Sequence, residues 1–266
     1  MERILGGLGR RLARFLSRSV RPGTASRPSD PTRLLDTLRP GDVLLVEGDT
    51  RLSTAIKYLT QSTWSHAALF VGDALGGLRD ADGICNLVEV DLTEGVHARS
   101  LSDYARLHTR ICRPVGLSPQ EVTRLVEFMV SRIGYRYDLR NIVDLARYLL
   151  PTPPVPVRWR RRLLALGSGD PTRAICSSLI AQAFQSLRYP ILPHVDLRRS
   201  DAADCDDCLA EILRIRHHSL FTPRDFDVSP YFAIVKPTLD KCFDFRALTW
   251  SADAPFAELP SSVRIE

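Results

Sequence analysis

The pattern of apolar and polar residues between positions 43 and 113 predicts a small sheet. Short runs of strand length, bounded by Gly, Pro or polar turns, occur at 43–46, 62–72, 87–91, 95–101 and 109–113. Between the first two runs, residues 50–59 have the apolar spacing of a helix. Both faces of the run 62–72 are apolar, which predicts a central strand with His66 at its edge.

The rest of the chain has mainly helical periodicity. Ser118-Pro119-Gln120-Glu121 has the form of a capping box, and the apolar face that follows continues to Ile133, before Gly134. A second apolar helix is expected over 139–150, and a last strand over 231–235.

Another helix is expected to begin within Asp170-Pro171-Thr172 and to carry Cys176 in its first turns. Cys176 shares an inward face with Ile180 and Phe184 at helical spacing. A thiol near the positive end of a helix dipole loses its proton more easily, and the thiolate is the nucleophile. A buried structural cysteine is the alternative, because free cysteines are commonly buried. A partner histidine would favour the nucleophile.

His66 is the candidate partner, although a lone histidine beside a strand is usually structural. Glu89 lies in an apolar strand, where a carboxylate costs free energy unless it is paired. If this strand neighbours that of His66, Glu89 can accept the imidazole N–H and fix the tautomer. Asp91 lies on the same face and is the alternative acceptor, or else a solvated acid at the strand end. A thiol, a base and a group that orients the base are the parts of a nucleophilic enzyme.

The composition is that of a globular protein with one large core: 266 residues, 44% hydrophobic and 25% charged. The six cysteines lack the dense spacing of a disulfide scaffold, which favours a reducing, cytoplasmic compartment. No apolar run approaches the length needed to span a bilayer.

The net charge of +5 is concentrated at the start of the chain. Six arginines against one glutamate in residues 1–21 account for all of it, so the remainder is formally neutral. This distribution argues against nucleic acid as a partner.

Residues 3–20 have the pattern of a basic amphipathic helix, which can lie in a membrane interface. Two other interpretations are a helix docked on the domain's own surface and a partly disordered tail. Residues 21–31 are rich in Pro, Ser, Gly and Thr. We therefore divide the chain into an arm with its linker, 1–31, and a domain, 32–266. Because of this arm, we expect the protein to lie peripherally at the inner face of a membrane.

Two further segments have more than one interpretation. The proline-rich stretch 151–162 ends in arginines around Trp159. It can bind phosphate head groups at a membrane surface, or it can be a solvated connection to the next helix. Cys205 and Cys208, with His217-His218 nearby, suggest zinc at first sight. No second Cys pair or properly spaced His pair supports zinc, so we expect neither a metal nor a cofactor, and a structural zinc protein is kept as a separate hypothesis.

Taken in order, several short motifs resemble the circularly permuted papain-like branch of the NlpC superfamily, and within it the YaeF/YiiX-like permuted amidases, or lipo-like proteins. The motifs are Arg39-Pro40-Gly41-Asp42-Val43-Leu44-Leu45, Trp64-Ser65-His66-Ala67-Ala68-Leu69-Phe70, Leu87-Val88-Glu89-Val90, Gly134-Tyr135-Arg136-Tyr137-Asp138 and Cys176-Ser177-Ser178-Leu179-Ile180. They extend over roughly residues 33–240. Each is weak alone, and their order makes the resemblance specific.

The resemblance implies a papain-like α+β fold, in which a small antiparallel sheet packs against helices. It also implies Cys176 as nucleophile, His66 as general base and Glu89 in the orienting position. Tyr137 matches a position near the active-site wall, and it is equally well explained as a packed aromatic residue.

The expected activity is that of a thiol hydrolase or acyltransferase acting on an amide or ester. The arm and the Trp159 segment favour a lipid-like or acylated substrate, although fold alone does not determine substrate. The alternatives are a cell-wall peptide amidase and a non-catalytic lipid- or acyl-binding module on the same fold.

Overall fold

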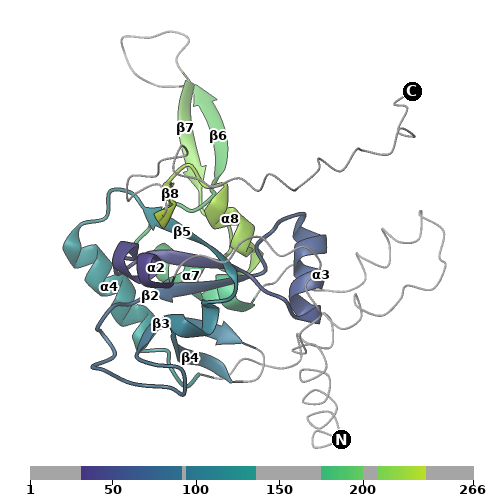
Figure 1. The fold of residues 1–266 in the computed structure, drawn as a ribbon. Coiled ribbons are helices and arrows are strands. Elements are labelled where there is room, and N and C mark those ends of the chain that lie inside the picture. Colours follow the sequence, from purple (N-terminus) through teal and green to yellow (C-terminus); the bar gives the residue numbers. More distant parts are fainter. Residues whose placement is uncertain (1–30, 92–93, 136–174, 200–208, 238–266) are drawn as a thin grey trace, which may run out of the picture.

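A six-stranded antiparallel sheet organises the protein, which was analysed as a computed structural model describing residues 31–91, 94–135, 175–199 and 209–237. The strand order is β4-β3-β2-β1-β5-β8 (Figure 1). These strands are β1 (Val43–Glu47), β2 (His66–Phe70), β3 (Cys85–Asp91), β4 (Gly95–Ser100), β5 (His108–Pro114) and β8 (Phe232–Val235). The α+β class and the small antiparallel sheet predicted from sequence are confirmed.

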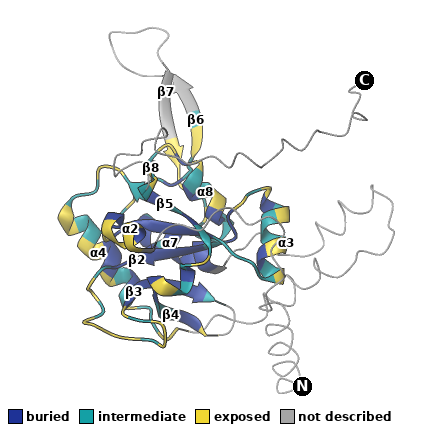
Figure 2. Cartoon of the chain, viewed as in Figure 1, coloured by how far each residue is buried: buried dark blue, intermediate teal, exposed yellow. Residues whose placement is uncertain are grey.

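Two apolar layers cover the sheet, one on each face (Figure 2). On one face, the larger cluster contains Ala67 and Leu69 of β2 together with residues of α4 (Pro119–Val130), α7 (Ile175–Ser186) and α8 (Pro223–Asp227). On the other, Ala68 and Phe70 pack with α2 (Pro31–Thr37) and the short 3₁₀ helix η1 (Leu101–Tyr104). Burial on both faces explains why β2 has no polar side, as the apolar run 62–72 predicted.

Local signals account for the ends of the helices. Thr50 caps α3 (Arg51–Thr60), and its side chain accepts the N–H of Ser53. Ser118 and Glu121 form the predicted capping box at the start of α4. The helix ends at Val130, earlier than the apolar pattern up to Ile133 indicated, and turns lead from there to Gly134 at φ +90°.

A separate two-stranded hairpin, β6 (His194–Arg199) and β7 (Leu209–Arg214), projects from the body (Figure 1). Near its base the chain forms η2 (His218–Leu220), which packs against α7. The hairpin and α2 are additions to the elements expected from sequence. The expected arm, the helix over 139–150, the 151–162 stretch, Tyr137 and the Cys205/Cys208 pair lie outside the described residues.

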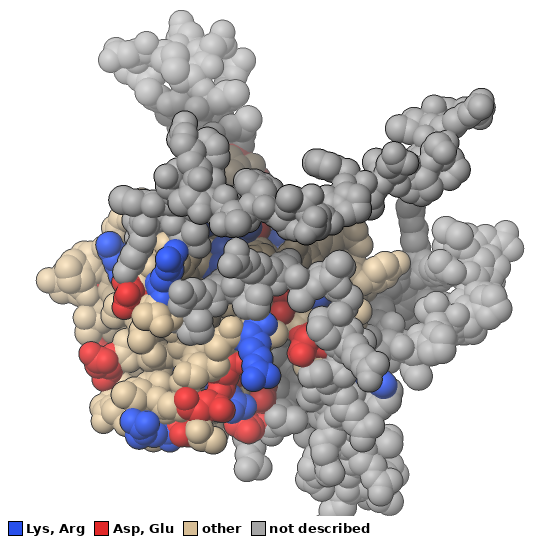
Figure 3. Space-filling model, viewed as in Figure 1, with Lys and Arg blue, Asp and Glu red and all other residues tan. Residues whose placement is uncertain are grey.

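Charged side chains of both signs are mixed on the visible face of the described body (Figure 3). Acidic groups gather toward the β3–β4 end, where basic side chains lie among them. None of the described helices combines the length and the apolar character that crossing a bilayer requires.

Candidate active site

Pairing of β2 with β3 brings the predicted base and acid together. The two strands are antiparallel neighbours, with Leu69 opposite Val88 and Phe70 opposite Leu87. His66 is the first residue of β2, and Glu89 lies in the middle of β3 on the face that also carries Leu87. Nε2 of His66 lies 2.5 Å from Oε2 of Glu89. The structure therefore places Glu89 against the imidazole, whereas Asp91 accepts the backbone N–H of Glu94 at the strand end, at 2.6 Å.

The segment before His66 is fixed by backbone contacts. The N–H of Ser65 donates to the carbonyl of Val46 at 3.1 Å, and the Ser65 hydroxyl accepts the N–H of Gly48 at 2.9 Å. A side chain on Gly48 would collide with Ser53, since an added Cβ would lie 2.3 Å from its hydroxyl oxygen. This close approach holds the start of β2, and with it the imidazole, against β1.

Cys176 occupies the second position of α7 and is buried, with 5% of its surface exposed. Helix α7 packs against β2 and β3, and Ser177 donates a 2.7 Å hydrogen bond to the carbonyl of Phe221. The Cys176 thiol lies close enough to the imidazole of His66 to raise its pKa. The structure thus brings Cys176, His66 and Glu89 together, as the sequence suggested.

The electrostatics of the imidazole and the carboxylate are coupled. Burial by itself favours neutral imidazole, but the negative charge of Glu89 and the contact with Cys176 outweigh it and raise the pKa of His66 well above its usual value. Burial likewise favours a protonated Glu89, and the opposing effect of His66, aided by His97 and Tyr104, holds the pKa of this carboxyl well below its usual range. The geometry therefore favours imidazolium next to carboxylate.

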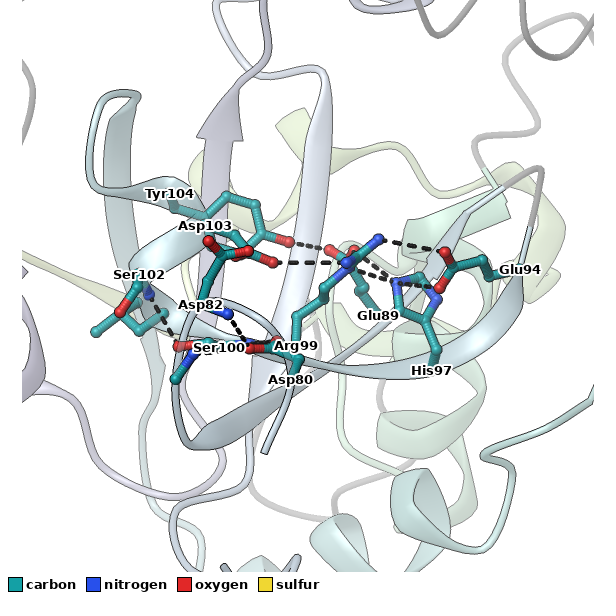
Figure 4. A network of polar contacts seen from close by, with 12 residues as sticks. Asp80, Asp82, Glu89, Glu94, His97, Arg99, Ser100, Ser102, Asp103 and Tyr104 are labelled. Carbon is teal, nitrogen blue, oxygen red and sulfur yellow. Dashed lines mark hydrogen bonds and ion pairs between the residues drawn. The ribbon is translucent and has the colours of Figure 1, made fainter. Parts of the chain in front are cut away.

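Three residues around Glu89 were not singled out from the sequence: His97, Arg99 and Tyr104 (Figure 4). The Tyr104 hydroxyl donates to Oε2 of Glu89, the oxygen that also contacts His66. Nε2 of His97 lies 3.0 Å and Nε of Arg99 lies 3.5 Å from the other oxygen, Oε1. The alternation of His97 and Arg99 in a predicted strand was the available signal, because it places both on one face.

Two groups of side chains are close enough to share a cation: Asp91, Glu94 and His97, and Asp80, Asp82 and Asp103. Within the second group, Asp80 accepts backbone N–H groups from Asp82 and Gly83, each at 2.9 Å, and from Ser100 at 2.7 Å. These bonds give Asp80 a structural role in the turn that leads into β3.

The chain was also compared with known proteins. No family model matches the chain. Over 172 residues it is 26% identical to a protein named "Probable lipoprotein peptidase YaeF" from Escherichia coli K12, and the aligned part covers 58% of each chain. This similarity agrees with the resemblance to the YaeF/YiiX-like proteins that the sequence motifs indicated.

Among solved structures, the chain is similar to the "metalloprotein yiiX" of Escherichia coli O157:H7. The identity is 15% and the TM-score 0.42, with 74% of this chain and 96% of that chain covered. The match to YaeF spans 58% of that relative's length.

Proposed function

We propose that this chain is a cysteine-dependent hydrolase or acyltransferase that acts on an amide or ester bond through Cys176, His66 and Glu89. One observation carries the proposal: His66 bonds to the carboxylate of Glu89 and lies close enough to the buried thiol of Cys176 for the two groups to interact. The similarity to a probable lipoprotein peptidase supports hydrolysis as the reaction class.

The first step is proton transfer from the thiol to the imidazole. Because Nε2 is held by Glu89, Nδ1 is the nitrogen left to take the proton from Sγ of Cys176. The raised pKa of His66 stabilises the resulting imidazolium, and Glu89 keeps it oriented.

The thiolate then attacks the substrate carbonyl carbon, and the carbonyl oxygen becomes an oxyanion. The backbone N–H of Cys176 lies in the first turn of α7, where helix N–H groups lack intrahelical partners, and is suited to donate to this oxyanion. Collapse of the intermediate breaks the bond to the leaving group, which takes the proton from His66. A thioester remains on Cys176. Attack by water, deprotonated by His66, releases the acid and regenerates the thiol; attack by another nucleophile gives acyl transfer.

A lipid-like or acylated substrate is part of the proposal and rests on the sequence of the arm and of the Trp159 segment. The p-nitrophenyl esters of acetate and dodecanoate provide a direct test. We expect release of p-nitrophenol, faster with the longer chain, and an acyl adduct on Cys176 in mass spectra of quenched enzyme. Cys176→Ser and His66→Ala abolish both signals.

Cys112 provides an internal control within the same spectra. Its thiol is fully buried, and burial raises its pKa, so it remains unmodified. Binding of dodecanoate without turnover or adduct would instead support the non-catalytic acyl-binding module. Turnover of cell-wall peptides, with neither ester accepted, would support the amidase.

Peripheral membrane contact through residues 3–20 is tested separately. We expect the full chain to co-sediment with vesicles containing phosphatidylglycerol but not with neutral phosphatidylcholine vesicles, because the arm carries the net positive charge. Removing residues 1–30 abolishes co-sedimentation and leaves p-nitrophenyl acetate hydrolysis unchanged. Equal sedimentation with and without the arm would contradict this assignment.

A further inference from the structure

The carboxylate of Glu89 is held at both oxygens by groups other than His66. Tyr104 donates to Oε2, and His97 contacts Oε1 from the opposite side, as Figure 4 shows. We propose that Tyr104 and His97 are positioning residues that act on the reaction through Glu89, by keeping its carboxylate ionised and fixed toward His66. This inference rests on the proposed function, because it assigns roles within the same site.

Tyr104 is placed rigidly for this role. It ends η1, whose first turn is capped by the Ser100 hydroxyl, and it is buried among the apolar residues of the second face of the sheet. Its ring lies beside that of His66, with centroids 6.5 Å apart and planes inclined by 28°. Burial and the charge of Glu89 raise the pKa of Tyr104, so its hydroxyl keeps its proton and acts as a donor. A hydrogen bond from a neutral donor to a buried carboxylate favours the ionised acid.

His97 holds the second oxygen through the register of the sheet. It lies directly opposite Glu89 in the β3–β4 pair. Nδ1 is 3.0 Å from the carbonyl of Gly95, which can only accept, so this nitrogen carries a proton. In the neutral ring Nε2 accepts the Nε–H of Arg99 at 2.9 Å. In the protonated ring Nε2 carries a proton and donates to Oε1 of Glu89, 3.0 Å away. Burial opposes that protonation, but the hydrogen bond to Glu89 outweighs it and raises the pKa of His97.

The surrounding charges support an ionised Glu89. From β4, Arg99 approaches Oε1 at 3.5 Å and Nε2 of His97 at 2.9 Å. Arg99 in turn lies 3.7 Å from both Glu94 and Asp103, which face it from the turn before β4 and from η1. With His66 on β2, these are the charged groups around Glu89 in the described part of the chain. The guanidinium of Arg99 is thus shared with two other acids, whereas Tyr104 and His97 make the shorter contacts with the two carboxylate oxygens.

The test is the pH profile of Cys176 alkylation by iodoacetamide, followed by peptide mass spectrometry in the folded, full-length protein. In the wild type the rate rises with pH as the thiolate–imidazolium pair forms. We expect Tyr104→Phe and His97→Ala to move the midpoint upward by about half a pH unit or more. Without these contacts the Glu89 carboxylate is less ionised and less firmly oriented, so it stabilises the imidazolium of His66 less. His97→Gln, whose amide can still donate to Oε1, is expected to restore most of the shift.

Tyr189→Phe is the matched control. It also removes a tyrosine hydroxyl, which donates to the carbonyl of Tyr231 at 2.6 Å, away from the site, and it is expected to keep the wild-type midpoint. A wild-type midpoint in Tyr104→Phe and His97→Ala, with low-pH reactivity lost in His66→Ala, would overturn the positioning roles alone. Unchanged reactivity in His66→Ala would instead overturn the proposed function. If Tyr104→Phe fails to fold, the comparison of His97→Ala with His97→Gln still decides the inference.

Discussion

His66 and Tyr104 contact the same carboxylate oxygen of Glu89, Oε2, and Nε2 of His66 lies 2.5 Å from it. The carboxylate is almost completely buried, whereas 23% of the imidazole side chain is exposed. The acid is thus more deeply buried than the base that it contacts. This arrangement suits an acid that orients a base and does not itself meet substrate.

Replacing Glu89 with glutamine keeps the shape of the side chain and removes its charge. We expect Glu89→Gln to slow alkylation of Cys176 near pH 6 by about tenfold or more, since one unit of pKa corresponds to a tenfold change in the ionised fraction. At pH 10, where an ordinary thiol is already ionised, the two proteins should react at similar rates. A uniform reduction at every pH would point to loss of access to the thiol and contradict the electrostatic role.

The strands could be predicted because their apolar periods are local. The identity of the acid could not: Glu89 and Asp91 share a face, and only the pairing of β2 with β3 decides between them. The contact of His97 with Glu89 likewise depends on register, because a slip of one residue would turn His97 to the other face.

Strands that have little contact with the core were harder to predict from the pattern of apolar residues. The hairpin β6–β7 pairs only with itself in the described part of the chain, and Val195 and Leu213 are exposed there. Without a buried face, such strands need not alternate between apolar and polar residues. The inward helical face of Cys176 could be predicted, because its apolar spacing is local. Its proximity to His66 could not be predicted from spacing, because the two residues lie far apart in the sequence.

The ion pair also predicts a maximum of stability in mildly acidic solution. The pKa of Glu89 is lower in the folded protein than in the unfolded chain. Glu89 therefore stabilises the fold at pH values above its unfolded pKa, and this stability is lost as pH falls through its folded pKa. The pKa of His66 is higher in the folded protein than in the unfolded chain. Its contribution to stability is complete at pH values below the unfolded pKa and is lost as pH rises through the folded pKa. Urea unfolding should therefore show the largest difference between the wild type and Glu89→Gln between about pH 5 and 6.5. A difference independent of pH would contradict this linkage.

Asp103 should respond to pH in a distinct way. Burial, a hydrogen bond with Asp82 and the charge of Asp80 raise the pKa of Asp103 to about 6. Oδ1 of this residue is buried without a hydrogen-bond partner. Its neutral form is favoured in the folded protein, so its contribution to stability is complete below the unfolded pKa and is lost as pH rises through about 6.

Asp103→Asn is therefore expected to stabilise the protein by about 1 kcal/mol at pH 8 and by little at pH 4. Urea unfolding at the two pH values measures the difference. The same gain at both values would show that the charge of Asp103 is not its cause. Loss of stability at pH 8 would show that its ion pair with Arg99, at 3.7 Å, outweighs the burial of the carboxylate.

The Arg39-Pro40-Gly41-Asp42 turn owes its stability to a buried carboxylate. Asp42 is 1% exposed, and its oxygens accept two bonds from Arg113, at 2.9 and 2.7 Å, and one from the N–H of Arg39. Asp42→Asn removes the charge and one acceptor from this pair. We expect a loss of about 2–3 kcal/mol in the free energy of unfolding, because hydrogen bonds to charged groups are worth about that much.

Lys57→Ala is the matched control for the Asp42 experiment. Lys57 also forms an ion pair, with Glu47 at 3.3 Å, but 27% and 23% of the two side chains are exposed. Solvent screens such a pair, so its removal should cost less than about 1 kcal/mol. The comparison uses urea unfolding at pH 7 for both variants. Equal losses would mean that burial does not strengthen the Asp42–Arg113 contact.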